Sequence, residues 1–255
     1  MSESAISSEQ RSTAVVTGAS AGIGAATARA LAAAGFHVVL GARRMGLLTE
    51  IAGEIGGTAL PLDVLDAGSI SAFADGVGPA RVLVNNVGGA KGLEPVLETS
   101  DEDWRWMWEM NVLATLRITR ALLPRLIASG NGHVVTVTST AALEAYDHGA
   151  GYTSAKHAQS VLHRTLRGEH LGEPVRFTEI LPGMVETDFS LIRFSGDAER
   201  AAGVYAGLTP LSADDVAQTI AFAVTRPAHV NIDRIVLRPR AQHSTMRVHR
   251  EDREG

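Results

Sequence analysis

The stretch Thr17-Gly18-Ala19-Ser20-Ala21-Gly22-Ile23-Gly24 is the part of this sequence that decides its fold. An apolar, β-prone run at 13–16 precedes it, and an alanine-rich stretch at 25–34, typical of a helix, follows it. A strand, a glycine-rich loop and a helix in this order are the context that a nucleotide-binding loop needs. The glycines let the backbone approach a pyrophosphate, whose charge is favoured by the free N–H groups and the dipole of the helix. Taken alone, the stretch could also be a tight turn without a ligand.

The composition is that of an ordinary globular protein, and it excludes several kinds of site. Of the 255 residues, 45% are hydrophobic and 20% are charged, and the chain is long enough for one α/β domain. A net charge of −5 argues against a general nucleic-acid binder, and the absence of cysteine excludes disulfides, thiolate metal sites and a cysteine nucleophile. The nine histidines are scattered, without a metal-binding pair on a predicted helix, so we expect no metal.

The compartment is predicted from the same features. The first ten residues are polar and acidic, unlike a signal peptide, and no apolar run approaches the ~18 residues of a membrane span. We therefore expect a soluble, cytoplasmic protein that acts on a small molecule and binds neither a membrane nor nucleic acid.

Apolar runs that favour strands alternate with stretches that favour helices along the whole chain. The strands are expected at 13–17, 37–40, 58–64, 81–88, 133–139, 175–181 and 232–237. The helices are expected at 22–34, 46–55, 66–76, 101–128, 150–171 and 212–225, with Pro124 as a candidate bend. This alternation predicts an α/β fold, a single-domain Rossmann-type, doubly wound, mainly parallel seven-stranded sheet with helices on both faces.

One dinucleotide-binding domain is expected at 13–240. A flexible N-terminal tail at 1–12 precedes it, and a C-terminal tail at 241–255 follows, which we interpret as a solvated end or, less favoured, a subunit contact. Residues 186–208 are expected to form a mobile helical lid over the substrate.

The end of the second predicted strand indicates which nucleotide is bound. It reads Gly41-Ala42-Arg43-Arg44, where an NAD site usually carries an acidic residue that binds the ribose 2′-hydroxyl. An arginine suits a 2′-phosphate, as a charge-assisted and bidentate partner, so NADP is favoured over NAD. A solvated basic pair is the alternative. Asp63 and Val64, after the third strand, could meet the adenine, although Asp63 could equally cap a helix.

A second group of residues carries the predicted chemistry. Tyr152 and Lys156 are four residues apart near the start of a predicted helix and therefore share a face. A phenol, with a pKa of about 10, becomes a usable base when an ammonium nearby favours the phenolate. Ser139 could hydrogen-bond the substrate oxygen, and Asn111, a polar residue inside a helix, could pin a water behind Lys156. Singly, each has a plain alternative: a surface pair, a turn residue or a satisfied polar group.

Together, these motifs resemble the short-chain dehydrogenases/reductases over about residues 13–240. The shared motifs are Thr-Gly-x-x-x-Gly-Ile-Gly at 17–24, Asn85-Asn86-Val87-Gly88, Asn111, Ser139, Tyr152-x-x-x-Lys156, and Pro182-Gly183 with Thr187. The resemblance implies a catalytic tetrad of Asn111, Ser139, Tyr152 and Lys156. It implies cofactor contacts from Gly18, Ser20, Gly22, Ile23, Gly24, Arg43, Arg44, Asp63, Val64, Asn86, Tyr152, Lys156, Pro182, Gly183, Val185 and Thr187. The chain departs from the family at Val87, where alanine is usual.

The C-terminal third resembles one branch of that family, the NADP-dependent 3-hydroxy acid dehydrogenases, in residues 188–197, 211–216 and 227–232. Members of this branch oxidise serine, L-allo-threonine and related 3-hydroxy acids. The resemblance implies reversible hydride transfer between NADP(H) and a secondary alcohol or ketone, with a small 3-hydroxy acid as substrate.

Two substrate contacts are predicted beyond Ser139. Arg193, or less favourably Arg200, would bind the carboxylate of the substrate, and Glu144 could bind an amine. The alternatives are a solvated lid arginine and a surface carboxylate. A bulkier ketone or aldehyde reduced by NADPH remains an alternative substrate. A non-catalytic NADP(H)-binding regulator is the alternative from another class, although such proteins usually lose the tyrosine–lysine pair.

Three tryptophans point to assembly. Trp104 and Trp108 share one face of a predicted helix while Trp106 points elsewhere, so one core face cannot bury all three. Because the family builds its subunit interfaces largely from this helix and the one at 150–171, we expect a homo-oligomer, a homotetramer or a dimer, that buries at least one of them.

Overall fold

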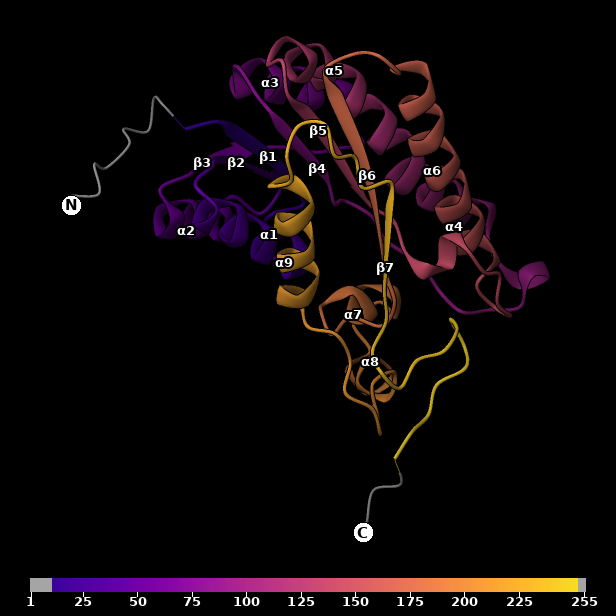
Figure 1. Ribbon diagram of the computed structural model, residues 1–255. Helices are drawn as coiled ribbons and strands as arrows, with labels where there is room; N and C mark the ends of the chain where they lie inside the picture. Colours follow the sequence, from indigo (N-terminus) through magenta and orange to yellow (C-terminus); the bar gives the residue numbers. More distant parts are fainter. Residues whose placement is uncertain (1–10, 252–255) are drawn as a thin grey trace.

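The computed structural model describes residues 11–251, and a parallel sheet runs through its centre. The sheet has seven strands in the order β3-β2-β1-β4-β5-β6-β7, and each neighbouring pair is parallel (Figure 1). The strands are β1 (Thr13–Thr17), β2 (His37–Ala42), β3 (Thr58–Pro61), β4 (Val82–Asn85), β5 (Gly132–Val137), β6 (Val175–Pro182) and β7 (Arg234–Leu237). The predicted doubly wound α/β fold is confirmed.

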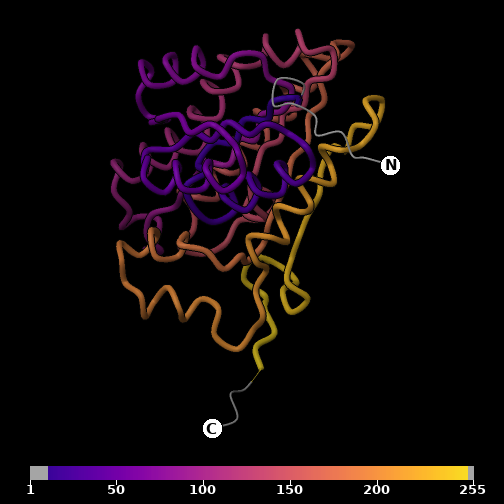
Figure 2. The backbone as a smooth tube through the Cα atoms, turned by 90° about the vertical axis from the view of Figure 1, so that its left-hand side faces the viewer, coloured from indigo at the N-terminus to yellow at the C-terminus, as the bar shows by residue number. Residues whose placement is uncertain are grey.

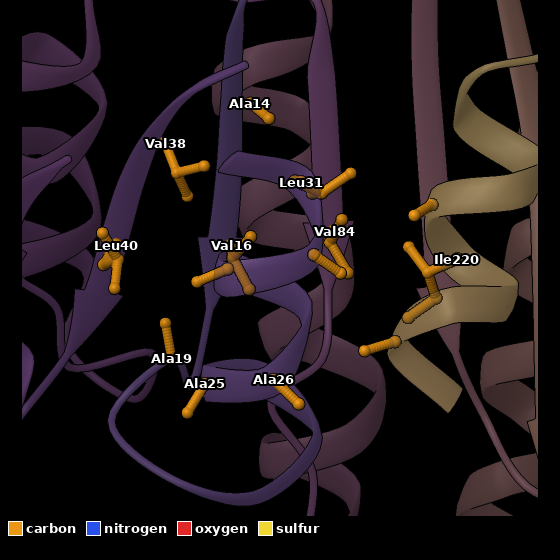
Figure 3. Close-up of a cluster of buried hydrophobic side chains, with 14 of the residues drawn as sticks. Ala14, Val16, Ala19, Ala25, Ala26, Leu31, Val38, Leu40, Val84 and Ile220 are labelled. Atoms are coloured by element: carbon orange, nitrogen blue, oxygen red, sulfur yellow. The ribbon is translucent and has the colours of Figure 1, made fainter. Parts of the chain in front are cut away.

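Helices cover both faces of the sheet because its central strands are apolar on both sides. One face carries α1 (Gly22–Ala33), α2 (Met45–Ile55) and α9 (Ala213–Val224) (Figure 1). The other face carries α3 (Ala67–Val77), α4 (Asp101–Trp108), α5 (Ala114–Ala128) and α6 (Ala150–Glu169). Figure 3 shows the first core, where Leu31 of α1 and Ile220 of α9 lie against the sheet at Val16 and Val84. Val15, one residue from Val16, faces the second core, as the alternation of a strand requires.

The strand order fixes where a ligand can bind. From β1 the chain winds through β2 to β3 on one side, and from β4 through β5 and β6 to β7 on the other. The loops that follow β1 and β4 therefore diverge, and they leave a crevice at the carboxyl ends of the strands.

The predicted helix at 101–128 is interrupted, but not at Pro124. Its regular parts are α4 and α5, and one turn of π-helix (Glu109–Leu113) separates them. Pro124 lies inside α5. The irregularity surrounds Asn111, whose side-chain amide donates to the carbonyl of Met107 at 2.7 Å, as a main-chain N–H would in an α-helix. The interruption therefore lies at Asn111 and not at the proline, and a bend at Pro124 stays a prediction.

Two further segments close the carboxyl end of the sheet. Within the expected lid at 186–208 lie two short helices, α7 (Phe189–Arg193) and α8 (Ala198–Gly203). The C-terminal chain runs beside them at the same end of the molecule (Figure 2). Short 3-10 turns are present at Val96–Glu98 and Thr140–Ala142. The mobility of the lid stays a prediction.

The interpretation of the C-terminal tail as a solvated end is wrong for residues 241–251. Gln242 is 6% exposed, and its Oε1 accepts the N–H of Met184 at 2.9 Å. The Arg250 guanidinium donates to the carbonyl of Val204 at 3.0 Å. The expected N-terminal tail lies almost wholly outside the described residues. Within residues 11–251, no helix combines the length and the apolar character that crossing a membrane would take.

Candidate active site

The glycine loop between β1 and α1 is shaped by three glycines with different tasks. Gly18 and Gly22 have φ angles of +66° and +53°, in the left-handed region that favours glycine. Gly24 has no such angle, but a Cβ there would collide with the carbonyl oxygen of Gly18. Gly24 does not line the cavity, where a cofactor contact was expected. Its missing side chain instead lets the start of α1 pack directly against the backbone of Gly18.

A cavity of about 700 Å³ lies where the sheet topology predicts it, beyond the carboxyl ends of the strands. With the exception of Gly24, the residues expected to contact the cofactor all line it. They are Gly18, Ser20, Gly22, Ile23, Arg43, Arg44, Asp63, Val64, Asn86, Tyr152, Lys156, Pro182, Gly183, Val185 and Thr187. Ser139 and Arg193 line the same cavity, so the predicted reacting groups and the nucleotide-binding groups share one space.

The rim of the cavity next to β2 fits the phosphorylated ribose of a dinucleotide. The Nε of Arg44 donates to Oγ of Ser20 at 3.2 Å, which holds the guanidinium across the glycine loop. Arg43 lines the same rim. Two cations beside a hydroxyl and a helix N-terminus match the charge and the hydrogen-bonding needs of a phosphate.

Asp63 does not cap a helix. The cap of α3 is Asp66, whose Oδ1 accepts the N–H of Ser69 at 3.0 Å. Asp63 accepts the N–H of Leu65 at 3.0 Å and faces the cavity beside Val64, in the place expected for an adenine contact.

The loop after β4 is tied to the loop after β1. The side-chain amide of Asn86 donates to the carbonyl of Thr17 at 3.0 Å, and Oγ1 of Thr17 donates to the carbonyl of Val84 at 3.2 Å. Val87 packs close to Gly18, where a Cβ would come within 3.2 Å of Cγ2 of the valine. The larger residue at this position therefore contacts the glycine loop.

Tyr152 and Lys156 are brought together by the first two turns of α6. Tyr152 is 8% exposed and Lys156 is 3% exposed, and the ammonium lies 5.7 Å from the centre of the phenol ring. Burial raises the pKa of Tyr152 above its ordinary range, while a hydrogen bond from Ser139 and the charge of Arg193 lower it. Burial lowers the pKa of Lys156 to about 7, against the charge of Glu179. Arg193 is thus a positive charge beside Tyr152 whose effect on the phenol was not expected from the sequence.

Arg193 reaches the reacting groups from α7. Its Nε donates to the carbonyl of Gly92 at 3.0 Å, and its Nη2 donates to the hydroxyl of Tyr146 at 3.1 Å. Its guanidinium carbon lies 5.8 Å from the centre of the Tyr152 ring. The cation therefore stands beside the phenol, held by one backbone and one side-chain contact.

Two of the predicted substrate residues lie elsewhere. Arg200 stacks on Phe194, 4.5 Å from its ring centre, and is not among the lining residues. Glu144 is also outside the lining, because one of its oxygens accepts Arg238 at 2.8 Å and the other accepts the N–H of Thr245 at 2.8 Å. The expectation that Glu144 binds a substrate amine is corrected: it anchors the C-terminal segment.

Asn111 does not line the cavity, unlike the other three members of the expected tetrad, although a Cβ on Gly88 would come within 2.8 Å of its Oδ1 and within 3.0 Å of Nζ of Lys156. Its side chain is fully buried, donates to the carbonyl of Gly89 at 2.8 Å and accepts the N–H of Gly89 at 3.2 Å. These bonds hold the loop after β4 and use the side-chain amide of Asn111. Its main-chain carbonyl accepts the hydroxyl of Thr115 instead. Asn111 therefore shapes the site without lining it.

Several cavity residues carry no sequence motif and were missed. Tyr146, Trp106, Phe189 and Met246 form much of the wall on the substrate side. Tyr146 could have been suspected from its place between Ser139 and Tyr152, whereas Met246 is brought in by the C-terminal segment alone. No cluster of three His, Cys, Asp or Glu side chains suited to a metal is present between residues 11 and 251.

Comparison with known proteins identifies the family. Residues 12–195 match the family model of the short chain dehydrogenases. An uncharacterised oxidoreductase of Mycobacterium tuberculosis is 63% identical over 92% of this chain and 93% of its own length. A serine 3-dehydrogenase of Agrobacterium fabrum is 36% identical over 89% of this chain and 93% of its own. The solved closed form of a serine dehydrogenase complexed with NADP+ superimposes with a TM-score of 0.88 at 34% identity, covering 94% of this chain and 100% of that one. The chain belongs to the short chain dehydrogenase family.

Proposed function

We propose that this protein transfers a hydride reversibly between NADP(H) and a secondary alcohol or ketone, and that its substrate is a small 3-hydroxy acid. The observation that carries the substrate class is the position of Arg193, a cation 5.8 Å from the ring of Tyr152. A carboxylate bound by this guanidinium would lie beside the Tyr152 ring, which suits an acid whose hydroxyl is close to its carboxylate. The resemblance to a serine 3-dehydrogenase and to an NADP+ complex supports the same conclusion.

The residues of the chain divide the work between binding and proton transfer. The nicotinamide, when bound, accepts or supplies the hydride. Tyr152 accepts the hydroxyl proton of the alcohol on oxidation and returns it on reduction. Ser139 hydrogen-bonds the oxygen on which charge develops, and the glycine loop binds the pyrophosphate. Lys156 supplies positive charge beneath the phenol, and Arg193 fixes the carboxylate.

A bulkier ketone or aldehyde is the second candidate substrate, and one observation favours it. The substrate side of the cavity is lined with large apolar side chains, among them Trp106, Phe189, Ile192 and Met246. A polar acid of three or four carbons is too small to contact all of these apolar side chains. The two candidates differ in whether a carboxylate is needed, which a substitution can decide.

Arg193 is tested with a matched pair of substrates, 3-hydroxybutyrate and its neutral methyl ester. Arg193→Ala should lower kcat/KM for the acid about tenfold or more relative to the ester, because one charge-assisted contact is lost. The ratio cancels any effect on Tyr152, which both substrates share. Arg200→Ala, at an arginine outside the cavity, is the control and should leave the ratio unchanged. Equal losses on acid and ester would contradict the carboxylate role and favour the bulkier substrate.

Arg44 is tested through cofactor binding. Arg44→Ala should weaken NADPH binding about tenfold or more, because a 2′-phosphate loses a charged partner, and should change NADH binding little. Fluorescence titration of the reduced nicotinamide gives both dissociation constants without any turnover. Arg29→Ala, an exposed arginine of α1 paired with Glu54, serves as the control for a general charge effect. Equal weakening of NADPH and NADH would rule out the assignment.

We also propose that the protein works in the cytoplasm as a homo-oligomer, a tetramer or a dimer. Trp108 of α4 is 44% exposed and Val161 of α6 is 52% exposed, although both are large and apolar, and the two helices pack side by side. Static light scattering at micromolar concentration should give a multiple of 26.9 kDa. Trp108→Glu should reduce that mass, and a monomeric wild-type protein would contradict the proposal.

A further inference from the structure

The Lys156 ammonium lies in a place where it needs a partner. It is 3% exposed, and a cation taken out of water costs free energy unless hydrogen-bond acceptors replace the lost hydration. Its Nζ donates to Oε1 of Gln159 at 2.8 Å. Gln159 is fully buried and lies three residues further along α6, on the same face.

The contact continues into the neighbouring helix. Nε2 of Gln159 donates to Oγ1 of Thr115 at 2.8 Å, and Oγ1 of Thr115 donates to the main-chain carbonyl of Asn111 at 2.8 Å. Thr115 is 3% exposed and lies in the first turn of α5. Three buried hydrogen bonds thus connect the lysine to the backbone of the π-helical turn.

The direction of every bond in this chain is fixed by chemistry. An ammonium can only donate, so the amide oxygen of Gln159 must face Lys156 and its nitrogen must face Thr115. An amide nitrogen only donates, so the threonine hydroxyl accepts from it and gives its own proton to the carbonyl of Asn111. The amide of Gln159 neither takes up nor releases a proton near neutral pH, so it cannot pass one from Lys156 to Thr115. The arrangement can hold the lysine, but it does not conduct its proton.

We propose that Gln159 is the residue that positions Lys156, and that Thr115 and the carbonyl of Asn111 anchor Gln159 in turn. The inference deepens the proposed function and rests on the role given there to Lys156. It assigns to Gln159 the task of keeping a buried cation beneath Tyr152 and of stabilising its charge. It also gives Asn111 a part in the site through its main chain, since its side chain is committed to Gly89 and Met107.

The test measures the charge of Lys156 directly. The sequence contains only two lysines, Lys91 and Lys156, so the full-length protein labelled with 13C-lysine gives two side-chain signals in an NMR titration. Lys91→Arg leaves the signal of Lys156 alone. The wild-type pKa of Lys156 should be about 7. The titration uses no cofactor and no substrate, so it can fail or succeed independently of the proposed function.

Two substitutions at Gln159 should move this pKa in opposite directions. Gln159→Met keeps the volume but removes the acceptor, and should lower the pKa of Lys156 by about one to two units. Gln159→Glu restores an acceptor and adds a negative charge, and should raise it above the wild-type value. The Glu variant keeps the proposal testable if the Met variant does not fold. A pKa that stays within a few tenths of the wild-type value in the variant that folds would overturn the proposal and leave Gln159 a packing residue.

Thr115→Val tests the anchor. This variant keeps the hydrogen bond between Lys156 and Oε1 of Gln159 but removes the acceptor of Nε2 of Gln159. The pKa of Lys156 should therefore fall less than in Gln159→Met. In the double variant with Gln159→Met, the pKa of Lys156 should be the same as in Gln159→Met alone, because the series of hydrogen bonds is already interrupted at Gln159. Full additivity of the two effects would show that Thr115 acts by another route and would contradict the chain of contacts.

Discussion

The burial of the Lys156 ammonium is the constraint on which the site depends. A cation this far from water is stable only if the protein provides acceptors at fixed positions. The fold provides them by bringing α6 against the π-helical turn between α4 and α5, next to Thr115 in the first turn of α5. Gly88 is part of this arrangement, because a Cβ there would lie 2.8 Å from Oδ1 of Asn111 and 3.0 Å from Nζ of Lys156. The absence of a side chain at Gly88 thus leaves room for the buried ammonium of Lys156 and the amide of Asn111.

The sheet supplies the second requirement, which is a common frame for the cofactor and the reacting groups. β1 and β4 are neighbours, yet their following loops leave in opposite directions, and Thr17 and Asn86 join those loops by hydrogen bonds. Ser139 extends from the next strand, β5, and Tyr152 from the helix that follows it. Every group that must meet the substrate is therefore attached to the carboxyl end of the sheet, within one cavity. The π-helical turn and the hydrogen-bonded side chains of Lys156, Gln159 and Thr115 lie on helices that pack against this sheet.

The sequence predicts the parts of this structure that depend on local patterns. Alternating apolar runs predict the sheet and its helices, glycine spacing predicts the loop, and the separation of Tyr152 and Lys156 predicts their shared helix face. The rest depends on contacts between distant residues. Glu144 meets Thr245, and Arg193 meets Gly92, about a hundred residues away in each case. Gln159 has no motif, since its importance follows from Thr115 on another helix. The interruption of the helix expected at 101–128 lies at Asn111, whose contacts with Gly89 no local pattern predicts.

The central claim is that Tyr152 moves a proton while a hydride passes to or from NADP. The most direct measurement is the absorbance of the reduced nicotinamide, with purified protein, NADP+ or NAD+, and 3-hydroxybutyrate, serine or L-allo-threonine. The account predicts that reduced nicotinamide forms with NADP+ in preference to NAD+. It also predicts that Tyr152→Phe abolishes the reaction while NADPH still binds. Binding of NADPH by the wild-type protein without turnover of these acids, of a simple secondary alcohol or of bulkier ketones would contradict the account and indicate a nucleotide-binding regulator.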